Sequence, residues 1–412
     1  MHVLAVNCGS SSIKVRVFDT DSDFRLLVKG VAERIGQESA FLSLVTENRR
    51  EFRKTLPLPD HRAAMHALHH TLVEGDADFV DTVRPIHGVG HRIVHGGERF
   101  RAPVLITADV IAGIAEAARF APLHCRPNLI GIEVAQELLP DIPHVAVFDT
   151  AAHQSLPPKA FLYGLPAELY AKHKVRRYGF HGINHSYVAQ VAAQMMAQPL
   201  ADLKVITCHL GNGCSITAFA QGQSVDTSMG LTPLEGLLMG TRCGDLDPAA
   251  VLYLMEELGL TTSEVTDLLN NKSGLLGLCG TNDMRDVLAL AEAGNTHAQV
   301  AREMFVYRIQ KYIGAYTAVL NGIDLVVFTG GIGEKDPDVR ERVTANLAYL
   351  GAHVDRQKNE RNAPVFSSED SRVALLTIPA NEERVIAQHV YELLTQSEEL
   401  STQKMAIGSS GI

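Results

Sequence analysis

The sequence lacks several patterns that would assign it to a common protein class. Its 412 residues contain neither a G-x-G-x-x-G motif nor a P-loop lysine motif, which disfavours a Rossmann dehydrogenase and a P-loop kinase. The six cysteines form no C-x-x-C pair and no zinc-binding spacing, so we expect reduced thiols in a cytoplasmic protein. No basic segment followed by an apolar one precedes the first predicted strand, and we therefore expect no signal peptide.

Positive charge is also scarce. The formal net charge is −10 at pH 7, which argues against nucleic acid as the main partner. The most apolar long segment, 298–320, carries four charged side chains and is therefore not expected to span a membrane. Length and a hydrophobic content of 46% predict a folded protein of two or three domains.

Two segments share one pattern of apolar runs around a small-residue turn. Residues 3–18 place two apolar runs around a Gly-Ser tip at 9–12, and residues 205–219 place two such runs around Gly-Asn-Gly at 211–213. Each pattern predicts a β-hairpin whose tip exposes backbone N–H groups, a surface suited to phosphate. The repeat predicts two related halves, although Asn-Gly is by itself also a common tight turn.

Charged side chains follow further predicted strands, beside glycines. Arg92 leaves a strand before a Gly-Gly turn, where it suits a carboxylate or phosphate, and a surface salt bridge fits equally well. Asp149 follows the predicted strand 144–148 and can serve a metal, a proton or the capping of a turn. Arg242 lies among small residues, which suits a stabiliser of phosphoryl charge or an ordinary loop.

Later segments add a glycine-rich turn and two acidic residues. The predicted strand 324–329 runs into glycines and then a helix from about Pro337, as in nucleotide sites. Glu382 and Glu383 open a helix, where they complement its dipole or hold a metal. We also expect helices over 60–73, whose four histidines fit a solvated face better than a metal site, and over 108–119 and 127–139.

Together these motifs resemble the acetokinase family, within the superfamily of acetate and sugar kinases, Hsp70 and actin. The matches run in family order from residue 3 to about 395. They are Asn-x-Gly-Ser-Ser-Ser-x-Lys at 7–14, His-Arg-Ile-Val-His-Gly-Gly at 91–97, Phe-Asp-Thr-Ala at 148–151, Tyr-Gly-Phe-His-Gly at 178–182, His-Leu-Gly-Asn-Gly at 209–213, Met-Gly-Thr-Arg at 239–242, Gly-Gly-Ile-Gly-Glu at 330–334 and Asn-Glu-Glu at 381–383.

The resemblance implies a fold and a reaction. The fold is α/β, a two-lobed actin-like ATPase fold of duplicated ribonuclease-H-like domains with a cleft between them. Residues 1–150 and about 380–412 would form the first lobe, and about 151–379 the second lobe, which binds nucleotide and forms a homodimer. The reaction is reversible transfer of the ATP γ-phosphoryl group to acetate, with Mg²⁺, or Mn²⁺ as its substitute, giving acetyl phosphate and ADP. The alternatives are a propionate or butyrate kinase and, from another class, an Hsp70- or actin-like ATP-driven binding module.

The resemblance also implies roles for individual residues. Arg92 would bind the substrate carboxylate, and Arg242 and His181 would stabilise the moving phosphoryl group. We expect Asp149 to fix magnesium through water and to orient arginine, because an ionised carboxylate substrate has no proton to remove. Asn7 and Glu382 complete the metal environment. The ATP-binding set is Ser10, Ser12, Lys14, His209, Leu210, Gly211, Asn212, Gly213, Asp283, Met284, Arg285, Gly330, Gly331, Ile332, Gly333 and Glu334.

An apolar pocket would hold the acyl chain, and it is formed by Val94, Leu123, Phe180 and Pro233. Valine beside Arg92 leaves less room than alanine would, which favours acetate over propionate by a modest margin. The chain departs from the family pattern at Cys125-Arg126, close to Leu123, and this departure bears on the shape of the pocket.

Overall fold

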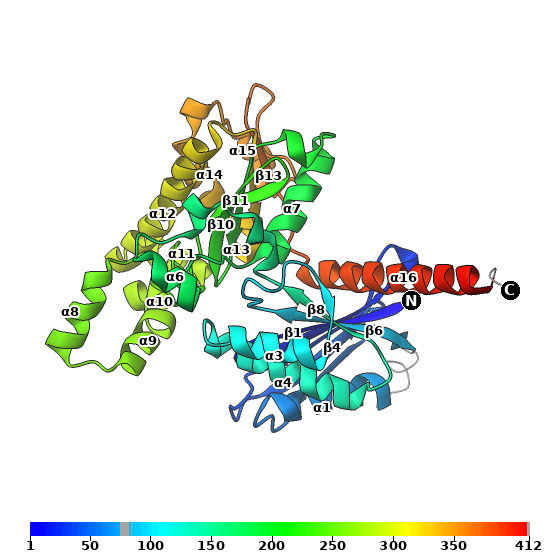
Figure 1. Ribbon diagram of the computed structural model, residues 1–412. Coiled ribbons are helices and arrows are strands. Elements are labelled where there is room, and N and C mark those ends of the chain that lie inside the picture. The colour runs from blue at the N-terminus through cyan, green and yellow to red at the C-terminus, as the bar shows by residue number, and fades with distance from the viewer. Residues whose placement is uncertain (75–81, 84, 410–412) are drawn as a thin grey trace. The chain divides into compact units, whose positions relative to one another are not determined.

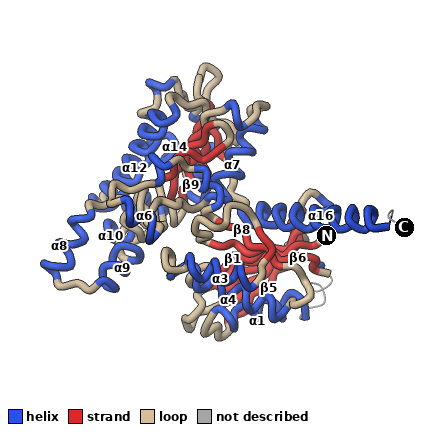
Figure 2. The backbone as a smooth tube through the Cα atoms, viewed as in Figure 1, coloured by secondary structure: helices blue, strands red, loops and turns tan. Residues whose placement is uncertain are grey.

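The computed structural model describes residues 1–74, 82–83 and 85–409, with the side chains at 74, 122–124 and 397–409 left aside. The chain divides into two compact units. Unit 1 comprises Met1–Ala151 and Asn381–Ile412, and unit 2 comprises Ala152–Ala380. Each unit has its own β-sheet, drawn in red in Figure 2.

The sheet of unit 1 has eight strands in the order β5-β4-β3-β2-β1-β6-β8-β7. Neighbours from β5 to β1 are antiparallel, β1, β6 and β8 are parallel, and β7 returns antiparallel to β8. The strands are β1 (His2–Cys8), β2 (Ser12–Asp19), β3 (Arg25–Glu33), β4 (Phe41–Thr46), β5 (Glu51–Thr55), β6 (Ile86–Ile93), β7 (Val104–Leu105) and β8 (His144–Phe148).

Helices cover both faces of this sheet (Figure 1). On one face lie α1 (His61–His69), which continues as the π-helix η2 (His70–Glu74), α3 (Ala108–Ala117) and α4 (Pro122–Leu138). On the other face α16 (Glu382–Ser409) packs against β1 and β6. The 3₁₀ turn η1 (Thr20–Ser22) follows β2.

One predicted boundary in unit 1 is wrong. The helix expected to begin at Pro127 begins at Pro122, and Pro127 lies inside it. The fixed φ of Pro122 suits the first helical position, where an N–H has no partner within the helix in any case. Pro127 costs the helix one further hydrogen bond without ending it.

The sheet of unit 2 has five strands in the order β11-β10-β9-β12-β13. Those from β11 to β9 are antiparallel, and β9, β12 and β13 are parallel. The strands are β9 (Val205–Leu210), β10 (Cys214–Ala220), β11 (Gln223–Thr227), β12 (Leu325–Thr329) and β13 (Ala374–Thr377).

Two long helices of unit 2 pack on this sheet, α7 against β9 and β12, and α12 against β10. Within the described residues, every helix is either too short or too polar to cross a bilayer. The helical segments of the unit are α5 (Pro158–Phe161), α6 (Ala167–His173), α7 (Gly182–Met195), α8 (Pro248–Leu258), α9 (Thr262–Asn271), α10 (Gly274–Cys279), α11 (Met284–Glu292), α12 (Thr296–Leu320), α13 (Gly330–Lys335), α14 (Pro337–Ala345) and α15 (Arg356–Glu360), with 3₁₀ turns η3 (Ala151–Ser155), η4 (Leu200–Asp202) and η5 (Ala348–Leu350).

The two sheets repeat one topology. In unit 1 the strands β3-β2-β1-β6-β8, and in unit 2 the strands β11-β10-β9-β12-β13, form three antiparallel strands followed by two parallel ones. This is the order of a ribonuclease-H-like domain, and its duplication in one chain is the actin-like ATPase fold. The predicted hairpins are β1–β2 and β9–β10, the corresponding first hairpins of the two units.

Two glycines of β6 allow α16 to approach the sheet of unit 1. A Cβ atom on Gly90 would lie 2.4 Å from Ile386 Cγ2 and 2.7 Å from Val390 Cγ2. Gly88 is similarly close to Val390 and Leu394. Since α16 begins at Glu382, this packing also sets the place of that carboxylate.

We expect Gly90→Ala to lower the free energy of unfolding by about 1–3 kcal/mol, because the added methyl group overpacks the contact with α16. Urea unfolding measures the change. Gly164→Ala is the matched control, because a Cβ atom there would meet nothing within 4 Å. Equal stability of the two variants would contradict close packing of α16 on β6.

Candidate active site

Arg92 joins the ends of four elements in unit 1. Its Nη1 donates to Asn7 Oδ1 at 3.3 Å and its Nη2 to Asp149 Oδ2 at 2.5 Å. Its Nε lies 3.6 Å from Glu382 Oε2 and makes no hydrogen bond. β1, β6 and β8 are parallel neighbours, so the side chains at their carboxyl ends meet at one edge of the sheet. The structure therefore brings together four of the residues that the sequence singles out.

Three carboxylates, those of Asp149, Glu382 and Glu383, act on this guanidinium. Burial acts to lower the pKa of Arg92, but the charges of Asp149 and Glu382 outweigh it and raise the pKa above its ordinary value. Burial, with the charges of Asp149 and Glu383, raises the pKa of Glu382 to about 7, although Arg92 opposes this change. A further cation at the site would relieve the repulsion among these carboxylates.

The oxygen donors of Asn7, Asp149 and Glu382 fit a hard divalent cation such as Mg²⁺. They number two carboxylates and one amide, and no group of three or more His, Cys, Asp or Glu side chains within the described residues could hold a metal ion. Mg²⁺ commonly takes one or two protein carboxylates and completes its shell with water and substrate phosphates. The donor set is thus compatible with a metal–nucleotide complex.

Asn128, which no sequence pattern singled out as a site residue, braces the strands that carry Asn7 and Arg92. It is buried in α4, its Nδ2 donates to the carbonyl oxygen of Cys8, and its Oδ1 accepts from the N–H of Val94, both at 2.9 Å. One amide therefore links the end of β1 to the end of β6.

The tip of the β1–β2 hairpin is exposed, and hydrogen bonds fix its backbone. The N–H of Gly9 donates to the carbonyl oxygen of Ser12 at 2.8 Å, and the ring Nε2 of His61 bonds the carbonyl oxygen of Gly9 at 2.7 Å. The solvated helix face expected for the histidines of 60–73 is therefore wrong for His61, because its ring holds the tip. Ser10 and Lys14 are exposed and Ser12 is half-buried.

The second tip gathers side chains within unit 2. A Cβ atom on Gly213 would lie 3.4 Å from Cε1 of His181 and 3.5 Å from Nη1 of Arg242, so both side chains border the tip. The N–H of Gly240 donates to the carbonyl oxygen of Asn212 at 3.0 Å. A Cβ atom on Gly240 would lie 1.9 Å from Asn212 Oδ1, so a larger residue there would displace that side chain.

His181 has a left-handed backbone, with φ 57° and ψ 21°, just before α7. This conformation costs a non-glycine residue about 1–2 kcal/mol and is often found at functional sites. The ring stacks on His209 with centroids 4.1 Å apart, and its Nδ1 lies 2.8 Å from Ser215 Oγ. Ser215 and His185 were missed from the sequence, where the only signal was a second histidine one helical turn after the first.

The irregular segment that carries Pro233 and Arg242 is braced by Arg177, another residue missed from the sequence. Arg177 Nη1 donates to the carbonyl oxygens of residues 227, 228 and 229 at 2.9, 3.0 and 3.1 Å. Its Nη2 lies 2.5 Å from Glu235 Oε1, and Arg242 Nη1 donates to the carbonyl oxygen of Pro233 at 3.2 Å. These bonds fix a long stretch without regular secondary structure.

The glycine-rich segment after β12, which was expected to be a turn before a helix, is itself the short helix α13, and it lies beside the second tip. Gly330 has φ +78°, and a Cβ atom on it would lie 2.7 Å from the carbonyl oxygen of Leu210. Glu334 Oε1 accepts from the N–H of Gly330 at 2.9 Å and from the N–H of Ala380 at 2.8 Å. This carboxylate therefore fixes the start of α13. Gly331 is exposed, Ile332 half-buried and Gly333 buried.

The remaining residues expected to bind the nucleotide lie partly on the surface and partly in the core. Asp283 caps α11 by accepting from the N–H of Arg285, whose side chain is 90% exposed and pairs with the same carboxylate. Met284 and Leu210 are buried core residues. His209 is half-buried and its Nδ1 lies 2.8 Å from Asn184 Nδ2, while Gly211 lies at the tip.

The residues expected to form the acyl pocket are divided between the two units. Val94, in unit 1, and Phe180, in unit 2, are buried, and Pro233, also in unit 2, is half-buried. The side chain of Leu123 lies outside the described part of the structure.

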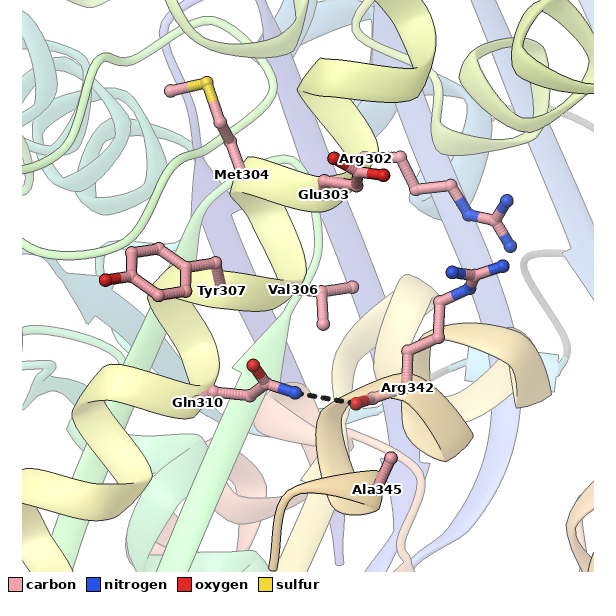
Figure 3. A pocket seen from close by; sticks show the side chains of 8 residues that line it. All are labelled: Arg302, Glu303, Met304, Val306, Tyr307, Gln310, Arg342 and Ala345. Carbon is pink, nitrogen blue, oxygen red and sulfur yellow. Dashed lines mark hydrogen bonds between the residues drawn. The ribbon is translucent and has the colours of Figure 1, made fainter.

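A separate pocket of about 510 Å³ lies between α12 and α14 (Figure 3). Tyr307, Val306 and Ala345 line it, and Gln310 Nε2 donates to the carbonyl oxygen of Arg342 at 2.8 Å. Its two arginines, Arg302 and Arg342, both pair with Asp338. None of the predicted site residues lines this pocket.

Duplicated ribonuclease-H-like domains, glycine-rich hairpin tips and arginines beside them define a phosphotransferase of the actin-like ATPase fold. The model of the acetokinase family matches residues 2–388 of this chain. The chain belongs to the acetokinase family.

Similar proteins agree with this assignment. An acetate kinase from Pseudothermotoga lettingae is 49% identical over 96% of this chain and 98% of its own length, and one from Carboxydothermus hydrogenoformans is 47% identical over 96% and 99%. Among solved structures, a Porphyromonas gingivalis acetate kinase has a TM-score of 0.88 at 39% identity, covering 95% of this chain and 99% of that one. A Francisella tularensis propionate kinase has a TM-score of 0.89 at 41% identity with the same coverage.

The raised pKa of Glu382 predicts how stability depends on pH. The folded state holds this proton up to about pH 7, whereas the unfolded chain releases it near 4.5. The folded state therefore binds more protons between these values, and this group makes stability fall as pH rises through them. We expect Glu382→Gln to gain about 1–3 kcal/mol relative to the unsubstituted protein between pH 4.5 and 8 without divalent cations.

Chemical denaturation of the two proteins across this pH range measures the difference. Glu133→Gln, which changes an exposed glutamate of the same unit, is the control. A difference between Glu382→Gln and the unsubstituted protein that stays constant with pH would show that Glu382 ionises normally.

Proposed function

We propose that this chain is an acetate kinase, which reversibly transfers the γ-phosphoryl group of ATP to acetate and forms acetyl phosphate and ADP. The observation that carries the proposal is Arg92, a guanidinium that Asn7 and Asp149 hold at the ends of parallel strands and whose side chain is 15% exposed. Such a planar group suits a carboxylate. An ATP-driven binding module that only hydrolyses ATP needs no carboxylate clamp.

The reaction requires positioning and charge stabilisation more than proton transfer. A carboxylate oxygen of acetate forms the new bond to the γ-phosphorus, the bond to the bridging oxygen breaks, and ADP takes the electron pair. Acetate is already ionised at neutral pH, so Asp149 serves as the partner that orients Arg92. Arg242 and His181, beside the second tip, stabilise the phosphoryl charge, and a well-placed arginine can contribute about 10³- to 10⁵-fold.

Asn7, Asp149 and Glu382 would hold Mg²⁺, or Mn²⁺ in its place, with water between. When bound, the metal neutralises charge on the phosphates of ATP. Its presence would also oppose the rise in the pKa of Glu382, since a cation favours the ionised carboxyl.

Unit 2 is the proposed nucleotide-binding lobe. The second hairpin tip and the glycine-rich segment α13 support this, since a Cβ atom on Gly211 would lie 4.0 Å from the N–H nitrogen of Gly331. Unit 2 would also form the homodimer, a proposal supported by α8, where Leu252, Tyr253 and Leu258 are 60–62% exposed.

Trapping with hydroxylamine tests the reaction directly. The purified protein is incubated with ATP, Mg²⁺, acetate and hydroxylamine, and acetyl phosphate is captured as acetohydroxamate. We expect hydroxamate that depends on both ATP and acetate. ATP hydrolysis without carboxylate-dependent hydroxamate would contradict the proposal and favour the binding module.

Arg92→Ala tests the clamp. Charge-assisted hydrogen bonds contribute about 1.5–3 kcal/mol, so we expect the KM for acetate to rise about 10- to 100-fold and the KM for ATP to change far less. Arg62→Ala is the control, because Arg62 is also a paired arginine of unit 1, with Glu133 and Glu137 at 2.6 Å. Equal increases in both KM values would refute a clamp specific for the carboxylate.

Propionate kinase is the second candidate, favoured by the Francisella structure. Val94 is buried directly after β6, the strand that carries Arg92, and its size favours the shorter acid. Since one methylene group contributes about 1–3 kcal/mol, we expect kcat/KM to be roughly 10-fold higher for acetate than for propionate, and butyrate to follow. Val94→Ala should narrow this ratio. A higher kcat/KM for propionate would assign the chain to the second candidate.

A further inference from the structure

A buried histidine that the proposed reaction does not use lies behind His181. His185 has no exposed surface, and it lies one turn further along α7. Burial, with the neighbouring His153 and His209, lowers the pKa of His185 well below its usual value, so the ring is neutral at physiological pH. A neutral imidazole carries one N–H and one bare nitrogen, and it therefore gives a chain of hydrogen bonds a direction.

Three short contacts join Thr207, His185, Ser215 and His181 in series. Thr207 Oγ1 lies 2.7 Å from His185 Nδ1, His185 Nε2 lies 2.7 Å from Ser215 Oγ, and Ser215 Oγ lies 2.8 Å from His181 Nδ1. Thr207 and Ser215 are fully buried on the paired strands β9 and β10. All four groups belong to unit 2, and the chain ends at the ring that borders Gly213.

Only one set of hydrogen-bond directions uses all three short contacts and also leaves a neutral His181 with an N–H at Nε2. Thr207 donates to His185 Nδ1, His185 Nε2–H donates to Ser215, and Ser215 donates to His181 Nδ1. The reverse order would make Thr207 donate to the carbonyl oxygen of Thr217 across 3.4 Å. It would also leave neutral His181 with a bare Nε2, which cannot donate to a phosphoryl oxygen.

Arg242 borders the same point of the second tip as the outer nitrogen of His181. A Cβ atom on Gly213 would lie 3.5 Å from both His181 Nε2 and Arg242 Nη1, so the two groups flank one point. A ring with its proton on Nε2 can donate at this point, whereas a neutral ring with its proton on Nδ1 cannot.

We propose that Ser215 and His185 are positioning residues that hold His181 as the neutral tautomer with its proton on Nε2, directed at the transferred phosphoryl group. This inference rests on the proposed role of His181. The groups that hydrogen-bond the far ring nitrogen of a functional histidine commonly set its tautomer in this way.

His153 restrains the backbone next to His181. Its Nε2 lies 3.1 Å from the carbonyl oxygen of Phe180, which can only accept, so Nε2 carries the proton and Nδ1 accepts from Ser224 at 2.9 Å. This bond holds the peptide that precedes the left-handed backbone of His181. The ring and the backbone of His181 are thus fixed by separate contacts.

The first test is the tautomer itself, read from two-bond ¹H–¹⁵N correlation spectra of the full-length protein labelled with ¹⁵N-histidine. Signals of His181 are identified by their loss in His181→Gln. We expect a protonated Nε2 and a bare Nδ1 in the unsubstituted protein, and a changed pattern in Ser215→Ala. A proton on Nδ1 in the unsubstituted protein, or an unchanged pattern in Ser215→Ala, would overturn the proposal.

The second test is kinetic. We expect Ser215→Ala to lower kcat about 10- to 100-fold while the KM values for ATP and acetate stay within about threefold, and Ser215→Thr to restore most of kcat. Thr217→Val is the control, because it removes a buried hydroxyl of β10 that bonds Thr227 and not the histidines. Unchanged kcat in Ser215→Ala would contradict the proposal.

Thr207→Val interrupts the same chain of hydrogen bonds from β9 and replaces Ser215→Ala as the test if that variant does not fold. We expect it to change the tautomer of His181 in the same direction. An unchanged tautomer would again contradict the proposal. A protein without carboxylate-dependent activity would refute the proposed function alone. The spectra need only folded protein, so they still decide whether the chain of hydrogen bonds sets the tautomer.

Discussion

The guanidinium of Arg92 is the group on which the arrangement of unit 1 depends. Its bonds to Asn7 and Asp149, and its proximity to Glu382, hold together the ends of β1, β6 and β8 and the start of α16. Two carboxylates can lie this close in a buried site because one cation lies between them. Even so, burial keeps the pKa of Glu382 raised to about 7, and the charges of Asp149 and Glu383 add to this rise.

The corresponding edge of unit 2 is organised by neutral polar groups. Serine, threonine and histidine side chains form a buried chain behind His181, while Arg177 braces the loop that carries Arg242. Buried networks of this kind are stable only when each member has a partner, and they then restrict rotamers and tautomers. The two units thus repeat one topology and use different chemistry at corresponding edges.

The repeated hairpin pattern in the sequence predicted the duplicated fold. Apolar alternation around Gly-Ser and Gly-Asn-Gly marks β1–β2 and β9–β10 because strand periodicity and turn composition are local properties. The start of α4 was misplaced because two prolines compete for the role of first helical residue and composition alone does not decide between them; the helix begins at Pro122 and continues through Pro127. Asn128 and Ser215 escaped notice because an isolated asparagine or serine has no periodic signal.

The sequence alone determined the family, the strand and glycine pattern and the types of reactive side chain, since these are written in contiguous motifs. Only the tertiary structure decided which of them meet. Arg92 and Asp149 are 57 residues apart, and His181 and Ser215 are 34 apart. It also showed that Glu334 fixes the start of α13, that Met284 lies in the core and that His185 and His181 share Ser215 as a partner. Contacts between distant positions depend on sheet register and helix packing, which no single segment encodes.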